Sequence, residues 1–103
     1  MIDYQEALVI MDRYLKALEK DTLVIRNQPE IELILIESST LEKPFGWIFF
    51  YNSRQFVEEG NLSYALAGNA PVIVDRLTGK LTETGTARSV EYYAELYERQ
   101  GYL

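Results

Sequence analysis

Residues 71–84 have the sequence PVIVDRLTGKLTET, which is typical of a β-hairpin. Pro71 biases the residue before it toward an extended backbone and is tolerated as the first residue of a strand, so we predict a strand over residues 71–76. Gly79 suits the positive-φ position of a longer hairpin loop. A second strand is predicted over residues 81–84.

Two other segments, residues 31–37 (IELILIE) and 47–51 (WIFFY), are largely apolar. A strand with one solvated face alternates polar and apolar residues, whereas a continuous apolar run indicates burial on both faces. We therefore predict two central strands. A helix on one face, and either a second helix or a partner on the other, would account for their burial.

Residues 3–20 are predicted to form an amphipathic helix. Asp3 and Glu6 have the spacing of a capping box, and apolar residues then recur at intervals of three and four. The run at residues 23–25 (LVI) is compatible with a short strand that ends before Pro29.

Two more helices are expected further along the chain. A short one covers residues 53–59 and stops at Gly60, and a longer one begins after the N-cap Ser89 and is closed by Gly101. The sequence of residues 62–69 favours neither a helix nor a strand.

The order of the elements is helix, strands, helix, within 103 residues. This order and length predict a single α+β domain over residues 1–103. We expect an antiparallel sheet of three to five strands, with the N-terminal and C-terminal helices packed on one face.

The chain has no histidine and no cysteine. It therefore lacks the commonest general base, the thiolate nucleophile and the usual ligands of transition metals, and we expect no catalytic residue, no metal and no cofactor. Carboxylate chemistry stays open, with Glu58 and Glu59 as the obvious pair. Adjacent residues point in different directions, so a solvated helix end is the favoured interpretation.

Sixteen acidic and ten basic residues give a formal net charge of −6. This charge opposes attraction to nucleic acid and to anionic membranes, so neither is expected as a partner. The N-terminal residues lack the pattern of a signal peptide, and with no cysteine we expect a cytoplasmic protein. The acidic residues are concentrated in residues 27–59, a stretch that contains six carboxylates and two cations.

Tyrosine is enriched among the residues that anchor protein interfaces. Four tyrosines lie on predicted helical stripes and are expected in the core: Tyr4, Tyr14, Tyr93 and Tyr97. Three others are not assigned to a helical stripe and are candidates for binding a partner: Tyr51, Tyr64 and Tyr102. Tyr64 is favoured among them. Trp47 begins an apolar strand and is expected in the core.

Three features resemble the immunity protein 35 family, a YrhB-like family of bacterial polymorphic toxin immunity proteins. They are the strand at residues 47–51, the segment LAGNAPVIVD at residues 66–75 followed by Thr78-Gly79, and the Gly85-Thr86-Ala87 step. The resemblance implies a small α+β protein that neutralises a toxin by direct binding, without catalysis. It also indicates fold-setting positions: Trp47, Gly68, Asn69, Pro71, Asp75, Gly79 and Gly85.

The leading hypothesis is therefore a binder that occludes the active or effector surface of a cognate toxin. Carboxylates would meet a basic toxin surface and aromatic side chains would anchor the contact. The predicted partner-binding residues are Glu30, Glu32, Glu37, Tyr51, Glu58, Glu59, Tyr64 and Asn69. A general protein-binding or chaperone-like domain is the alternative, and a carboxylate enzyme or divalent-ion binder ranks third. A homodimer formed through a sheet edge also stays open.

Overall fold

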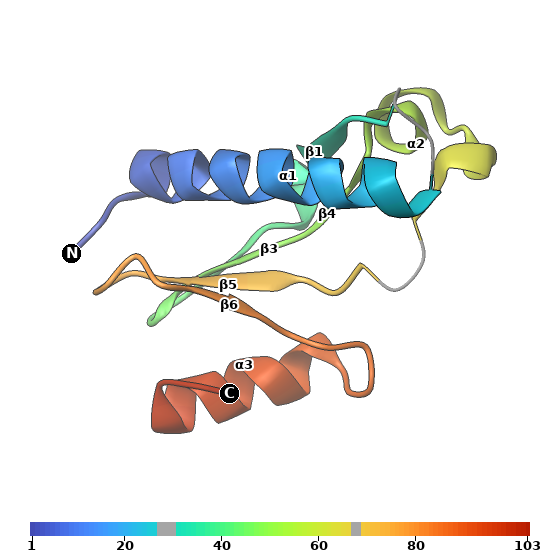
Figure 1. Ribbon diagram of the computed structural model, residues 1–103. Helices are drawn as coiled ribbons and strands as arrows, with labels where there is room; N and C mark the ends of the chain where they lie inside the picture. The colour runs from blue at the N-terminus through green and yellow to red at the C-terminus, as the bar shows by residue number, and fades with distance from the viewer. Residues whose placement is uncertain (27–30, 67–68) are drawn as a thin grey trace.

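The computed structural model describes residues 1–26, 31–66 and 69–103, with the backbone alone for residues 22–26. A four-stranded antiparallel sheet lies between two long helices (Figure 1). The helices are α1 (Tyr4–Arg26), α2 (Arg54–Glu59) and α3 (Val90–Gln100). The strands are β1 (Leu33–Leu35), β2 (Leu41–Lys43), β3 (Gly46–Phe49), β4 (Tyr51–Ser53), β5 (Val72–Asp75) and β6 (Leu81–Glu83). Single turns of 3₁₀ helix cover Glu37–Ser39 and Leu62–Tyr64. The predicted α+β class is confirmed.

The larger sheet has the strand order β2-β3-β5-β6, and β1 and β4 form a second, two-stranded sheet. The two sheets are almost continuous, because only Phe50 separates β3 from β4 and its carbonyl accepts a 2.8 Å hydrogen bond from the Ile36 N–H. The apolar run at residues 47–51 is thus divided between two strands. The run at residues 31–37 contains only the short β1, whose sole strand neighbour in the described chain is β4. The prediction of a central strand there is wrong.

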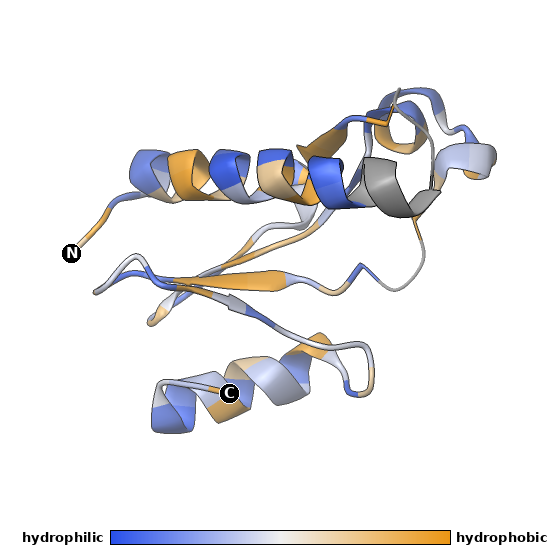
Figure 2. Cartoon of the chain, viewed as in Figure 1, coloured by the Kyte–Doolittle hydropathy of each residue, from blue (hydrophilic) through white to orange (hydrophobic). Residues whose placement is uncertain are grey.

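The central strands β3 and β5 bury side chains on both faces, as predicted for residues 47–51. Trp47 and Phe49 pair with Val74 and Val72 and pack against α1, in a cluster that includes Met11. The alternate pair, Ile48 and Ile73, faces the other way and packs against Ala94 and Tyr97 of α3. Figure 2 shows the apolar character of β5 between the two helices.

The two long helices therefore cover opposite faces of the sheet (Figure 1). The expectation that they share one face is wrong. The physical reason lies in Ile48 and Ile73, which are fully buried. Burial of such side chains contributes about 1.5–3 kcal/mol each, so the second sheet face must also be covered. A second helix, rather than a partner, covers it here.

Helix α1 begins with the predicted capping box. Asp3 Oδ1 accepts a 2.8 Å hydrogen bond from the Glu6 N–H, and Glu6 Oε1 accepts from the Asp3 N–H at 3.3 Å. The helix runs to Arg26, so the strand considered for residues 23–25 is wrong. Its β-branched residues disfavour a helix only weakly, and neither glycine nor proline interrupts the chain before Pro29. None of the described helices is suited in length and hydropathy to crossing a membrane.

The predicted helix ends at Gly60, Ser89 and Gly101 are confirmed, whereas Ser53, predicted as the first helical residue, is the N-cap of α2. The Ser53 side chain accepts from the Phe56 N–H at the start of α2, and the Ser89 side chain accepts from the Tyr92 N–H at the start of α3. The two helices end at Gly60 and Gly101.

Two glycines permit the close chain path around β5. Gly79 has a φ of +74° in the β5–β6 loop, as predicted. Gly46 pairs with Asp75, and a Cβ built on it would lie 2.1 Å from the Val74 carbonyl oxygen. No side chain fits in that space, so glycine is required at position 46. The sequence does not reveal this requirement, because the contact joins residues far apart in the chain.

Candidate functional site

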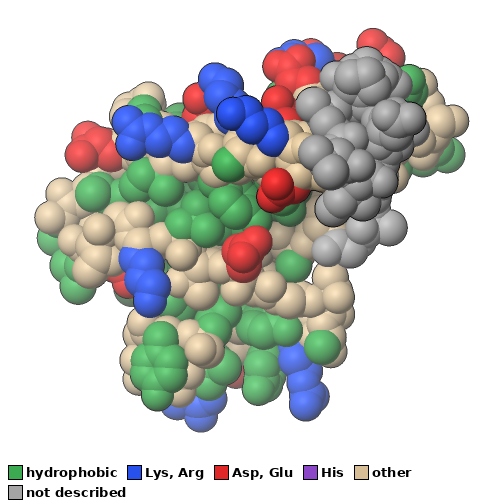
Figure 3. Space-filling model, viewed as in Figure 1, with side chains coloured by type: hydrophobic (Ala, Val, Ile, Leu, Met, Phe, Trp, Pro, Cys, Tyr) green, Lys and Arg blue, Asp and Glu red, His purple; other side chains and the backbone are tan. Residues whose placement is uncertain are grey.

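A groove of about 630 Å³ lies between α1, β1 and α2. Leu8 and Leu15 of α1 form apolar lining, together with β1 residues and Val57 of α2. Five carboxylates and two cations also line it: Asp12, Glu19, Glu32, Glu37 and Glu58 with Lys16 and Arg54. The groove thus carries an excess of negative charge. Figure 3 shows acidic and basic side chains gathered over α1 and α2.

Arg54, the first residue of α2, lies between two of the predicted glutamates. Its guanidinium donates to Glu32 through Nε at 2.7 Å and through Nη2 at 3.0 Å, and it also pairs with Glu58. The hydrogen bond from Arg54 lowers the pKa of Glu32 despite slight desolvation. Because exposed ion pairs contribute little to stability, a partner's cation can compete for these carboxylates at little cost.

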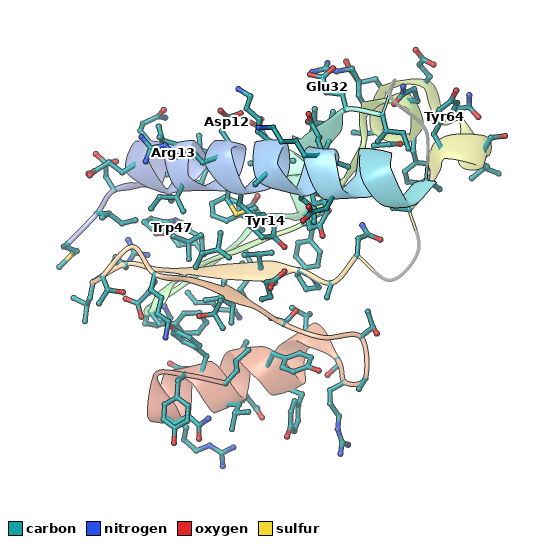
Figure 4. All side chains as sticks on the ribbon, viewed as in Figure 1. Asp12, Arg13, Tyr14, Glu32, Trp47 and Tyr64 are labelled. Carbon is teal, nitrogen blue, oxygen red and sulfur yellow. The ribbon has the colours of Figure 1, made fainter. Side chains whose placement is uncertain are left out.

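The α1 wall of the groove has its own charged groups. Lys16 Nζ lies 3.0 Å from Asp12 Oδ2, and this pairing raises the pKa of Lys16. Glu19 Oε2 accepts a 3.0 Å hydrogen bond from the Leu33 N–H, which links the helix to β1. In Figure 4, Asp12 and Glu32 point toward the same outer side of the molecule, while Trp47 and Tyr14 lie between α1 and the sheet.

Glu37 occupies one end of the groove and also lines a second hollow of about 510 Å³, beside Asp3 and Glu42. Its carboxylate makes no ion pair or hydrogen bond with the part of the chain that the structure describes. Glu42, in contrast, pairs with Arg76 at 3.0 Å, and the Arg76 guanidinium lies 4.5 Å from the Trp47 ring centre. Among the five groove carboxylates, Glu37 is therefore the one without a hydrogen bond or ion pair to the described part of the chain.

Comparison with known families gives a match to the model of immunity protein 35 over residues 5–96. The chain belongs to this family. A curated relative, the uncharacterized protein YrhB of Escherichia coli strain K12, is 43% identical over 53 residues, which are 52% of this chain and 56% of the relative. The chain therefore spans little more than half the length of that relative. No solved structure matches.

Several positions that carry the resemblance to immunity protein 35 lie inside the fold. Trp47 is only 3% exposed. The Pro71 carbonyl accepts hydrogen bonds from the Thr84 N–H and hydroxyl, which extends the pairing between β5 and β6. At Gly85, a Cβ would come within 2.7 Å of the Tyr93 hydroxyl. Gly68 lies outside the described residues.

Asp75 organises the loop after β5. Its Oδ1 accepts from the Leu77 and Thr78 N–H groups at 2.8 and 3.2 Å, and its Oδ2 accepts from the Tyr97 hydroxyl. Partial burial acts to raise the pKa of Asp75, but these hydrogen bonds outweigh it and lower the pKa. The carboxylate thereby joins the hairpin loop to α3.

Two of the three aromatic candidates for binding, Tyr51 and Tyr64, are less exposed than the glutamates. Tyr51 is 6% exposed and its ring lies 6.3 Å from that of Tyr14, so Tyr51 belongs to the core instead of the surface. Burial raises the pKa of both phenols, and the Tyr14 hydroxyl donates a 2.7 Å hydrogen bond to Glu83. Tyr64 is half-buried against the main core, with its carbonyl accepting from the Ser53 hydroxyl at 2.7 Å. Tyr102 is exposed on the C-terminal segment.

Asn69 makes an internal contact, since its Nδ2 donates to the Tyr51 carbonyl at 2.6 Å. This bond fits the fold-setting role expected for Asn69. Glu58 and Glu59 are both exposed at the end of α2. Glu30 lies outside the described residues.

The structure thus brings Glu32, Glu37 and Glu58 into one groove and leaves the tyrosines apart from it. Asp12 and Glu19, which form the α1 wall of the groove, were not among the residues predicted from the sequence. Their spacing on the outer face of a helix was visible, but such acids usually serve only solubility. Among the described residues, no cluster of three potential acidic metal ligands occurs.

Proposed function

We propose that this protein is an immunity protein that binds and neutralises a cognate polymorphic toxin by occluding its active or effector surface. The contact face is the acidic groove between α1, β1 and α2. The protein acts in the cytoplasm as a binding partner, and the proposal assigns it no catalysis, no cofactor and no interaction with nucleic acid or membrane.

The observation that carries this proposal is the acidic groove in a member of the immunity protein 35 family. Five carboxylates against two cations make the groove complementary to a basic protein surface. Such complementarity speeds association and disfavours wrong partners. The apolar lining, including Ile34 and Val57, supplies area that excludes water once the partner is bound.

Co-expression with the toxin encoded beside the gene tests the proposal directly. We expect cells that produce both proteins to grow, and cells that produce the toxin alone to die. Purified toxin and immunity protein should elute together from a size-exclusion column at low salt. Continued cell death in the presence of soluble immunity protein, for each toxin-like neighbour, would reject the proposal.

A general protein-binding or chaperone-like role is the second candidate, and an apolar surface favours it. Figure 3 shows hydrophobic side chains gathered between α1 and the β5–β6 hairpin. Four partly buried residues packed against the core belong to this side: Ile2, Ile10, Tyr14 and Leu81. Suppressed aggregation of unrelated proteins, together with no toxin-like neighbouring gene, would favour this role. Aggregation assays without any effect would exclude it.

A further inference from the structure

The outer edge of β1 presents backbone hydrogen-bonding groups to the groove. On the inner side, the Arg54 N–H donates to the Glu32 carbonyl at 2.7 Å, and the Ile36 N–H donates to the Phe50 carbonyl at 2.8 Å. Hydrogen-bonded and non-hydrogen-bonded pairs alternate along an antiparallel ladder. The intervening residues Leu33 and Leu35 therefore direct their N–H and carbonyl groups away from β4.

The two edges of the small sheet differ in how these groups are satisfied. On the β4 side, side chains close the edge: Asn69 donates to the Tyr51 carbonyl, and Asn52 Oδ1 accepts from the Ser53 N–H at 2.8 Å. On the β1 side, Glu19 accepts from the Leu33 N–H, but the Leu35 N–H has no partner among the residues that the structure describes. The β1 edge is thus open to an additional strand.

The surroundings of this edge have the shape that an added strand needs. Asp12 and Glu19 of α1 stand on one side of β1, and Val57 and Glu58 of α2 stand on the other. A strand paired with β1 would lie about 4.8 Å from it, within the groove. Its alternate side chains would then point toward the α1 wall and the α2 wall. With the excess of carboxylates in those walls, the matching side chains are cationic.

We propose that an extended, lysine- or arginine-bearing segment of the partner adds to β1 as an antiparallel or parallel strand. This inference rests on the proposed function and specifies how the same groove recognises its toxin. Main-chain hydrogen bonds to the Leu33 carbonyl and to the Leu35 N–H and carbonyl supply affinity, while the Leu33 N–H keeps its bond to Glu19. The groove carboxylates select a basic segment.

Charge also decides against a second copy of this protein as the occupant. Glu32 and Glu37 flank β1 at its two ends. Pairing of β1 with β1 of another copy would bring these carboxylates, and those of the groove walls, close to one another. Charged side chains at an edge strand are a common protection against such self-association. The same charges favour a cationic segment.

A designed peptide tests strand addition without the toxin. The probe is a seven-residue peptide of alternating lysine and valine with blocked ends, and the control is the same peptide with every backbone nitrogen methylated. Both carry the same charge, but only the first can donate backbone hydrogen bonds. We expect methylation to weaken binding to the full chain about tenfold, since each lost hydrogen bond costs about 1 kcal/mol.

Amide hydrogen exchange, followed by nuclear magnetic resonance, locates the contact. Saturation with the unmethylated peptide should slow exchange at Leu35 about tenfold or more, with a smaller change at Ile34, which already faces β4. Equal affinities for the two peptides, no detectable binding, or unchanged exchange at Leu35 would overturn the inference. Slowing at Leu35 that depends on protein concentration alone would also overturn it, in favour of a second copy.

These experiments distinguish a failure of the proposed function from a failure of the proposed strand addition. Protection from the toxin in cells, combined with no strand addition by the peptide, would leave the immunity function standing and remove only the recognition mode. Strand addition by the peptide, combined with no protection from any neighbouring toxin, would support an acidic peptide-binding groove and reject the toxin-neutralising function.

Discussion

The Tyr97 hydroxyl donates a 2.8 Å hydrogen bond to Asp75 Oδ2 and so connects α3 to the end of β5. Burial and this bond raise the pKa of Tyr97 to about 12. The same carboxylate caps the hairpin loop through the Leu77 and Thr78 N–H groups. One side chain therefore stabilises both a local turn and the packing of the helix that covers the second sheet face.

Replacement of Asp75 should cost more stability than replacement of its helix partner. Asp75→Ala removes three accepted hydrogen bonds, for an expected loss of about 2 kcal/mol, whereas Tyr97→Phe removes one, for about 1 kcal/mol. Urea unfolding of both variants measures the difference. Equal losses would show that the bonds within the loop contribute little.

Acid should selectively remove the contribution of Asp75. A carboxylate whose pKa is lowered on folding stabilises the protein above the ordinary pKa of about 4, and this stabilisation is lost as the pH falls through the lowered value. The free energy of unfolding of the wild type should therefore approach that of Asp75→Asn below about pH 4. Urea titrations from neutral to acidic pH test this convergence. A constant difference down to the lowest accessible pH would contradict it.

Gly46 should be far less tolerant of alanine than another glycine with positive φ. The added Cβ at position 46 would meet the Val74 carbonyl oxygen at 2.1 Å, whereas nothing lies within 4 Å of a Cβ at Gly60. We expect Gly60→Ala to lower the free energy of unfolding by about 1 kcal/mol, because of backbone strain alone. Gly46→Ala should lower it by about 3 kcal/mol or more, because the backbone must also shift to relieve the clash. Thermal unfolding of both variants is the measurement, and similar midpoints would refute the clash.

Much of this fold could be predicted where the signal is local. The capping box at Asp3, the N-cap Ser89 and the β5–β6 loop each depend on a few adjacent residues. The side of the sheet covered by α3 could not be predicted in this way. Apolar residues on both faces of β3 require that both faces be buried, but they do not determine which helix packs against which face.

The candidate site shows the same division between local and long-range information. Three glutamates of the acidic stretch at residues 27–59, Glu32, Glu37 and Glu58, line one groove. Their role in partner binding stays a prediction. The open edge of β1 was hidden, because a run of apolar residues looks the same in a central strand and in an edge strand between two helices. Tyr51 was placed at the surface for a similar reason: its burial depends on packing against α1.

Charge reversal within the groove should slow association with the toxin encoded beside the gene, while the same change elsewhere should not. Glu37→Lys alters a groove carboxylate that has no partner among the described residues, and Glu98→Lys changes net charge equally on exposed α3, on the opposite sheet face. Because steering depends on the local field, we expect Glu37→Lys alone to lower the association rate about fivefold at low salt, with the difference shrinking as salt screens it. Stopped-flow measurement of both variants separates the two effects. Equal slowing would mean that overall charge, and not the groove, steers the partner.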